Sequence, residues 1–160
     1  MKCLLSALLC TLLTLSVVTG TYDCQCTCPT GWMKFNGFCY KFFTERMTWA
    51  DATHHCHQLR SLLPSVPDEH VNNFLLTLIR SEDDREHSVW LGGTDCRKEG
   101  TWTWADGTPW NYTLWATGEP SNYQQEHCLQ LNWKGSSLWN DFPCTYKLPF
   151  ICARRVLWSN

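Results

Sequence analysis

The 160-residue chain has no apolar run of the roughly 20 residues that a membrane-spanning helix needs. It has no marked excess of either charge, since 13 Lys and Arg against 15 Asp and Glu give a formal net charge of -2. This balance removes the electrostatic case for a nucleic-acid partner or an anionic membrane surface. Internal repeats, low-complexity tracts and a lipid-anchor tail are also missing. We therefore expect neither nucleic-acid binding nor membrane insertion.

The amino terminus has the three-part layout of a secretory signal peptide. Met1 and Lys2 form a short basic start, residues 3–18 are uncharged and mostly apolar, and small residues follow at Thr19 to Thr21. The alternative is a membrane anchor, which the shortness of the apolar run disfavours. We predict a cleaved signal peptide over residues 1–20 and a secreted, extracellular protein of about 140 residues, the size of one domain.

Cysteine and tryptophan are abundant, with eleven Cys and ten Trp. This composition is typical of a disulfide-rich extracellular domain. The predicted signal peptide removes Cys3 and Cys10, and an odd number remains: Cys24, Cys26, Cys28, Cys39, Cys56, Cys96, Cys128, Cys144 and Cys152. At least one is therefore free or pairs outside the chain. Zinc is the competing interpretation, but no pair has C-x2-C spacing, so disulfides are favoured.

The pattern along the chain indicates two helices and several short strands. Alternating aromatic and polar residues predict a hairpin over residues 31–43, around an Asn36-Gly37 turn. Thr48 can cap a helix that continues to Leu59, and a second helix starts at Asp68. The short apolar strands are expected at 89–93, ending in a glycine turn, at 128–131 and at 149–152. The class is α+β, with two helices on small antiparallel sheets.

Residues 93–125 have little periodicity and are dense in Gly, Pro, Asn, Asp and Trp. A long irregular segment of this kind is uncommon unless it is functional. Around it stand several ordered motifs: WLGGTD (90–95), EGTWTWADGTPW (99–110), the triplet Glu119-Pro120-Ser121, and WND (139–141). In order and spacing these motifs resemble C-type lectin-like domains, over about residues 28–153. The compact layout is most similar to small secreted fish lectins, including venom lectins, and to type II antifreeze proteins.

The resemblance implies a long-form domain at residues 28–153, preceded by a short arm at 21–27 and followed by a tail at 154–160. It implies three disulfides: Cys28–Cys39, Cys56–Cys152 and Cys128–Cys144. In relatives, cysteines in the arm often link chains, so Cys24 or Cys26 can join two protomers into a disulfide-linked homo-oligomer. An unpaired arm and a bond to Cys96 are the alternatives. Cys96 resembles a cysteine of the antifreeze branch, whose partner this chain lacks.

Five oxygen-bearing side chains are predicted to bind a calcium ion, which takes six to eight oxygen ligands. The resemblance implies that they also contact sugar hydroxyls, and that Glu119-Pro120 is a cis peptide bond. The five are Glu119, Ser121, Glu126, Asn140 and Asp141. A second calcium site of the family would use Asp95, Glu99 and Asn122, but His127 stands where an acid is expected, which makes that site weak or absent.

The predicted function is that of a calcium-dependent carbohydrate-binding protein, a C-type lectin that is not an enzyme. Glu119-Pro120 resembles the mannose-type triplet more than the galactose type, whereas Ser121 departs from both. An antifreeze protein, or a calcium-independent protein-binding domain, is the alternative on the same fold. No His, nucleophile or metal arrangement typical of an enzyme is evident. Agglutination and a role in defence or venom are implied only by the resemblance.

Two further motifs have ordinary explanations. His54 and His57 are spaced so that they could share a helix face, but without a further ligand a solvated face is favoured. Asn111-Tyr112-Thr113 is an N-glycosylation acceptor sequence and predicts a glycoprotein modified at Asn111. Trp110 and Trp115 lie in the irregular segment, where packing is expected rather than ligand contact.

Overall fold

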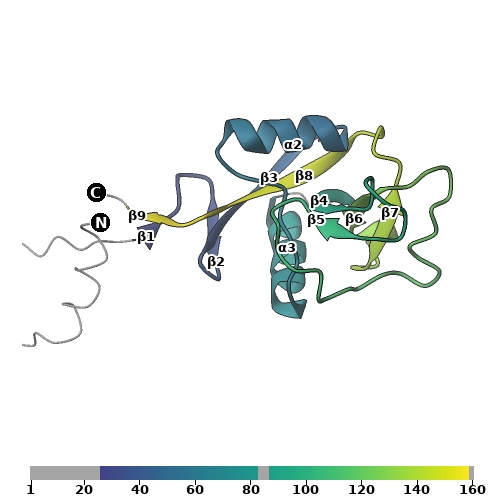
Figure 1. The fold of residues 1–160 in the computed structure, drawn as a ribbon. Helices are drawn as coiled ribbons and strands as arrows, with labels where there is room; N and C mark the ends of the chain where they lie inside the picture. The colour runs from purple at the N-terminus through teal and green to yellow at the C-terminus, as the bar shows by residue number, and fades with distance from the viewer. Residues whose placement is uncertain (1–25, 83–86, 159–160) are drawn as a thin grey trace, which may run out of the picture.

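The computed structural model describes residues 26–82 and 87–158 (Figure 1). The predicted signal peptide and Cys24 lie outside the described residues. Within the described part of the chain, no helix is long and apolar enough to cross a membrane. The structure consists of two mostly antiparallel sheets and two α-helices, which confirms the predicted α+β class.

The main sheet has the strand order β2-β3-β8-β4-β6-β7, with β5 paired to β4. Its strands are β2 (Met33–Phe35), β3 (Phe38–Met47), β4 (Val89–Thr94), β5 (Thr103–Trp104), β6 (Cys128–Leu131), β7 (Trp139–Phe142) and β8 (Leu148–Arg155). The predicted hairpin is confirmed, since β2 and β3 pair across Asn36 and Gly37. The two halves of the sheet join where β4 runs parallel to β8, at the pair Trp90 and Phe150.

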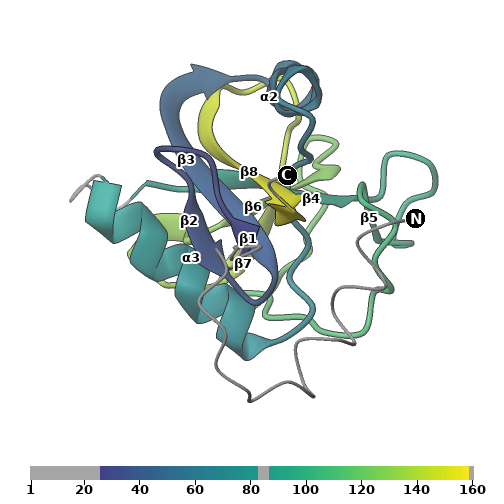
Figure 2. The same cartoon turned by 90° about the vertical axis from the view of Figure 1, so that its left-hand side faces the viewer.

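Each helix begins where the sequence predicts, at Thr48 as the predicted cap and at Asp68 as the predicted start, and both side chains act as caps. Thr48 Oγ1 accepts from the Asp51 N–H at 3.2 Å ahead of α2 (Trp49–Gln58). Asp68 Oδ1 accepts from the Val71 N–H at 2.9 Å ahead of α3 (Glu69–Glu82). Such caps satisfy backbone N–H groups that have no partner within the helix. The helices lie on opposite sides of the β3–β8 strands (Figures 1 and 2).

Two hydrophobic clusters and three disulfides hold these layers together. One cluster joins α3 to the inner faces of β4, β6 and β7, and the other joins α2 to Trp90 and Phe150. The disulfides Cys28–Cys39, Cys56–Cys152 and Cys128–Cys144 are present, as predicted. Cys56–Cys152 ties α2 to β8, and Cys128–Cys144 ties β6 to the segment after β7.

The glycines at the end of the predicted strand 89–93 do not form a turn. β4 continues through both of them to Thr94 and pairs with β5 and β6. A Cβ on Gly92 would lie 2.6 Å from the Leu63 carbonyl oxygen, and one on Gly93 would lie 2.9 Å from Leu129 Cβ. These glycines therefore allow neighbouring chain segments to approach the strand closely.

The predicted arm and tail meet in a second, two-stranded sheet. In it β1 (Cys26–Thr27) pairs antiparallel with β9 (Leu157–Trp158). β8 itself continues to Arg155, two residues beyond the predicted domain end at Ala153. The two ends of the described chain therefore lie side by side (Figure 1).

Tryptophan side chains pack the long irregular segment of residues 93–125 against the core, and this packing holds the base of the segment in place. The rings of Trp104 and Trp110 have centroids 4.4 Å apart, and those of Trp102 and Trp115 are 4.8 Å apart. Trp110 and Trp115 also lie edge-on to the fully buried Trp139. The packing expected for Trp110 and Trp115 is thus confirmed. The Trp115 backbone also bridges to Trp139, beside the end of β7.

Candidate functional site

Three carboxylates meet where the irregular segment crosses β7. An oxygen from each of Glu119, Glu126 and Asp141 lies within 4.8 Å of the other two. Glu119 comes from the loop, Glu126 from just before β6, and Asp141 from β7. β6 and β7 are paired in register, with Leu129 opposite Asp141, so the sheet itself sets the relation between the last two groups.

Asp141 holds the loop against the sheet. Its carboxylate accepts from the Ser121 N–H at 2.9 Å and from the Asn122 N–H at 2.7 Å, one bond to each oxygen. The side chain is 1% exposed. Each carboxylate oxygen has a second lone pair, so both retain the capacity to accept a further partner.

Glu126 is held from the same loop. Its carboxylate accepts from the Ser121 hydroxyl at 3.0 Å, and its backbone N–H donates to Asn122 Oδ1 at 3.1 Å. The side chain is buried. Ser121 and Asn122 therefore bond to both Glu126 and Asp141, and the loop is ordered by the acids it surrounds.

The electrostatics of this group favour a cation. Burial raises the pKa of Glu119, and the neighbouring Asp141 carboxylate adds to the rise. Burial also raises the pKa of Glu126, with further contributions from the charges of Asp141 and Glu119. Glu119 Oε2 is buried without a hydrogen-bond partner. Within residues 26–82 and 87–158, none of the three carboxylates forms an ion pair, so only hydrogen bonds from Ser121 and Asn122 offset their mutual repulsion.

The other two predicted ligands lie at the same place. Asn140 is buried on β7 and donates its side-chain N–H to the Asp141 carbonyl oxygen. Ser121 follows the Glu119-Pro120 bond, which is cis, as the resemblance implies. The structure thus brings Glu119, Ser121, Glu126, Asn140 and Asp141 to one end of the sheet. Hard oxygen donors in this number suit calcium, for which Asn140 Oδ1 and the three carboxylates are the strongest candidates.

Asp95 and Glu99, expected at a second calcium position, gather around a histidine. His127 Nδ1 lies 3.0 Å from Asp95 Oδ1 and 3.3 Å from Glu99 Oε2. Asp95 is buried, and its other oxygen accepts from the Gly100 N–H. The third expected residue, Asn122, directs its side-chain oxygen to the Glu126 N–H instead. Sequence spacing gave no signal for this last contact, because both residues lie in an irregular loop.

Three other predicted features are located. Cys96 is a free, exposed thiol, and its Sγ lies 3.8 Å from Cys144 Sγ, beside the Cys128–Cys144 disulfide. Asn111 is exposed in the irregular segment. His54 bonds to Gln58 on the same helix, and neither His54 nor His57 joins a potential metal-binding group among the described residues.

Comparison with known proteins identifies the family. The profile of the Lectin C-type domain matches residues 45–154. The galactose-specific lectin nattectin from Thalassophryne nattereri is 35% identical over 131 residues, 81% of this chain and 82% of that protein. A mannose-binding C-type lectin isoform from Oxyuranus scutellatus is 35% identical over 157 residues, 90% of this chain and 96% of its own.

A solved structure gives the same result in three dimensions. The herring type II antifreeze protein superposes with a TM-score of 0.76 at 34% identity, over 81% of this chain and 100% of that one. The relatives include lectins and type II antifreeze proteins. The profile match, the three disulfides and the loop-on-sheet architecture together show that the chain belongs to the C-type lectin domain family.

Proposed function

We propose that the protein is a secreted, calcium-dependent carbohydrate-binding lectin. The observation that carries the proposal is the group of Glu119, Glu126 and Asp141, whose oxygens lie within 4.8 Å of one another. Among the described residues, none of the three forms an ion pair. Glu119 Oε2 is a buried acceptor atom with no hydrogen-bond donor in reach among the described residues. An ion such as calcium would satisfy this oxygen and offset the repulsion among the three charges.

The residues of the site have separate tasks in sugar binding. When bound, calcium supplies coordination positions that two neighbouring sugar hydroxyls can fill. The Glu119 and Glu126 carboxylates can accept hydrogen bonds from those hydroxyls, and the Asn140 amide can donate one. Asp141 holds Ser121 and Asn122 in place through two short hydrogen bonds, so the loop needs little reordering when a ligand arrives.

We assign the sugar to the mannose type because Glu119-Pro120 resembles that triplet. Ser121 departs from the mannose-type triplet and should lower the affinity, since a hydroxyl is a weaker calcium ligand than an amide and lacks its NH2 donor. Its hydroxyl also donates to Glu126, which leaves fewer contacts for a ligand. Relatives include a galactose-specific and a mannose-binding lectin, so similarity alone favours neither sugar.

We propose a calcium ion only at the group of Glu119, Glu126 and Asp141. At the second position the His127 imidazole lies between the Asp95 and Glu99 carboxylates, in the space a second ion would need. A second calcium ion would therefore have to displace the histidine.

Secretion and assembly form the remaining parts of the proposal. The apolar amino terminus supports export, and three disulfides in the described domain fit an oxidising compartment. Cys24 or Cys26 would link protomers. Linked protomers would strengthen weak single-site sugar binding through avidity.

The testing experiment is retention on mannose and galactose resins in calcium, followed by elution with a chelator. The expected result is retention on mannose resin and release by chelator, with Glu45→Gln as a control that removes one exposed carboxylate elsewhere. Retention that persists in chelator would contradict the calcium mechanism. Retention on galactose resin alone would overturn the mannose assignment but not the calcium mechanism.

Ice binding is the second candidate, and the similarity to the herring antifreeze protein favours it. The two functions separate in one measurement, because ice binding produces a gap between melting and freezing temperatures that sugar binding does not. Such a gap, together with failure on both resins, would replace the lectin proposal.

A further inference from the structure

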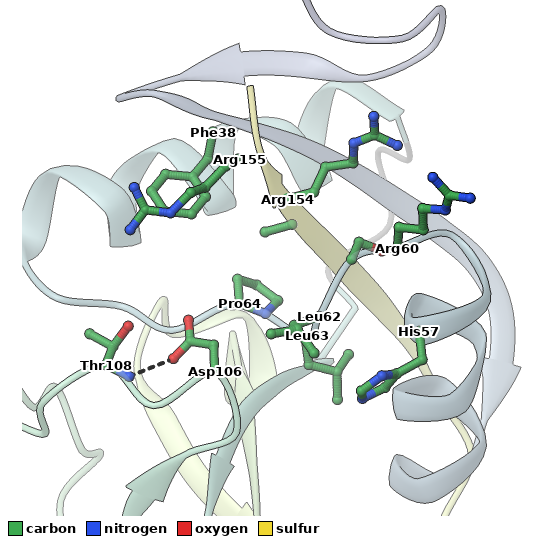
Figure 3. Close-up of a pocket in the computed structure, with 12 residues that line it drawn as sticks. Phe38, His57, Arg60, Leu62, Leu63, Pro64, Asp106, Thr108, Arg154 and Arg155 are labelled. Atoms are coloured by element: carbon green, nitrogen blue, oxygen red, sulfur yellow. Dashed lines mark hydrogen bonds between the residues drawn. The ribbon is translucent and has the colours of Figure 1, made fainter. Parts of the chain in front are cut away.

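A hollow of about 380 Å³ lies away from the carboxylate group and shares no lining residue with it (Figure 3). It sits between the end of α2, the end of β8 and the 106–108 loop. Its charged lining side chains are Arg60, Arg154, Arg155 and Asp106, and Leu62 and Pro64 provide an apolar floor. With three guanidinium groups and one carboxylate, the lining of the hollow is positively charged. The calcium group, formed by Glu119, Glu126 and Asp141, is negatively charged.

The single acid does not neutralise the arginines. Asp106 Oδ2 accepts from the Ser65 hydroxyl at 2.6 Å, and Oδ1 accepts from the Thr108 N–H at 2.9 Å. Figure 3 shows Asp106 turned toward Thr108 at the base of the hollow. Across the described ranges 26–82 and 87–158, no ion pair joins Asp106 or any other acid to these arginines.

Aromatic rings hold two of the arginines in place of carboxylates. The Arg155 guanidinium lies over the Phe38 ring at 5.3 Å, and that of Arg154 lies over Trp32 at 5.8 Å. Stacking on a ring face orients a guanidinium but leaves its N–H donors free. These donors match the geometry of an oxyanion such as sulfate or carboxylate.

A disulfide and two backbone hydrogen bonds join the chain segments that carry Arg60 and Arg154. The disulfide Cys56–Cys152 joins the segments that carry them. Between the same segments, Leu62 N–H donates to the Ala153 oxygen at 2.9 Å, and Ala153 N–H donates to the Leu62 oxygen at 2.8 Å. Figure 3 shows both guanidinium groups extending to the same side of the hollow. Two like charges are thus carried by joined segments, and among the described residues no acid forms an ion pair with either of them.

We propose that this hollow binds the sulfate group of an acidic saccharide, in a site separate from the calcium group. Arg60 and Arg154 would bind the oxyanion, whereas the Arg155 guanidinium lies on the other side of the hollow beside Phe38 (Figure 3). The apolar floor would support a sugar ring. The volume of the hollow lies within the range of small-molecule pockets. It exceeds the volume that a lone inorganic sulfate ion would fill. This proposal does not rest on calcium-dependent sugar binding, because no lining residue belongs to the calcium group.

The test is calorimetric titration of the full secreted chain in chelator, with a sulfated disaccharide, the same disaccharide without sulfate, and inorganic sulfate. The sulfated disaccharide should bind, and the other two should bind at least about tenfold more weakly. Chelator separates the outcomes, since loss of calcium removes the proposed lectin activity but leaves this site intact.

Matched variants locate the site. Arg60→Gln and Arg154→Gln should each weaken binding about three- to tenfold, within the range of a lost charge-assisted contact at an exposed site. Arg80→Gln removes the same charge from α3 and should change nothing. Arg60 is exposed, so its replacement leaves the fold intact even if Arg154→Gln, which removes a ring contact, does not. Absence of binding, equal binding of inorganic sulfate, or equal weakening by Arg80→Gln would each overturn the proposal.

Discussion

The Ser121 backbone N–H donates to the Asp141 carboxylate at 2.9 Å, across 20 positions of sequence. This bond ties the irregular loop to β7 and places the loop's oxygens beside those of the sheet. Asp141 is therefore both a candidate calcium ligand and the residue that orders the loop, whereas Glu119 has an oxygen with no partner. The two residues should differ when each is replaced.

Asp141→Asn and Glu119→Gln should both abolish calcium-dependent retention on sugar resin. In chelator they should diverge. Asn at 141 offers one acceptor oxygen to two N–H donors, so the free energy of unfolding should fall by about 1–3 kcal/mol. Glu119→Gln should leave it unchanged or raised, because a repelling charge is removed. Urea unfolding in chelator measures both, and an equal loss in the two variants would contradict these separate roles.

Lowering the pH should increase the contribution of Glu126 to the stability of the calcium-free protein, but it should weaken calcium binding. The pKa of Glu126 is raised, chiefly by burial, so the folded chain holds this proton more tightly than the unfolded chain does. In chelator, the contribution of Glu126 to stability is therefore full below the ordinary glutamate pKa and lost as pH rises through the raised value. In calcium, falling pH protonates the ligand and weakens binding.

Glu126→Gln isolates this effect. Thermal unfolding from pH 4 to pH 8 in chelator should show a smaller loss of stability with rising pH in the variant than in the wild type. Identical pH profiles for the two proteins would show that Glu126 is not the source.

Tyr40 should limit stability at high pH. Burial, reinforced by the charges of Asp106 and Asp68, raises its pKa to about 12 from the ordinary value of 10.0. Stability linked to Tyr40 is full below pH 10 and is lost as pH rises through about 12, by about 2–3 kcal/mol in total. Tyr40→Phe should flatten this part of the profile. Phenolate absorbance should show one tyrosine fewer ionising near pH 12, and an unchanged titration would contradict the assignment.

Asn72 should stabilise Trp139, the first residue of β7, which precedes the candidate calcium ligands Asn140 and Asp141. The Trp139 indole N–H donates to Asn72 Oδ1 at 2.8 Å, and both residues are buried. Asn72→Ala leaves that N–H without a partner and should cost about 1–3 kcal/mol. Asn73→Ala removes the same side chain from an exposed position of α3 and serves as the control in urea unfolding. A cost below about 0.5 kcal/mol for Asn72→Ala would show that water replaces the bond.

Cys96 should react in the native protein. Its thiol is exposed, and the Cys128–Cys144 disulfide beside it closes without it. Iodoacetamide should therefore label Cys96 without denaturant, and Cys96→Ser should leave the calcium-dependent melting temperature unchanged. Peptide mapping locates the label, and thermal unfolding with and without calcium measures the melting temperature. Finding Cys96 already joined to another cysteine would contradict the free thiol.

Much of the fold follows from local signals. Thr48 and Asp68 predict the helix starts because each can satisfy free N–H groups, and Asn36-Gly37 predicts the hairpin through its turn chemistry. The disulfide pairing, by contrast, came from family resemblance, because spacing alone leaves many connectivities open. The β1–β9 pairing was missed, since two-residue strands have no period to detect.

The sites divide in the same way. The five predicted calcium ligands lie together because motif order encodes their positions in the family, whereas the Asn122–Glu126 bond depends on loop conformation that no pattern reports. The arginine hollow joins residues 94 positions apart. The sequence contains a signal for this hollow, because Arg60 and Arg154 come shortly after Cys56 and Cys152, which are predicted to pair.

Calorimetric titration of calcium into the metal-free protein tests the central claim most directly, with Glu126→Gln and Glu45→Gln measured in parallel. The account predicts one calcium ion per wild-type chain, the same binding in Glu45→Gln, and strongly weakened binding in Glu126→Gln. No binding by the wild type, or binding that Glu126→Gln leaves unchanged, would contradict it.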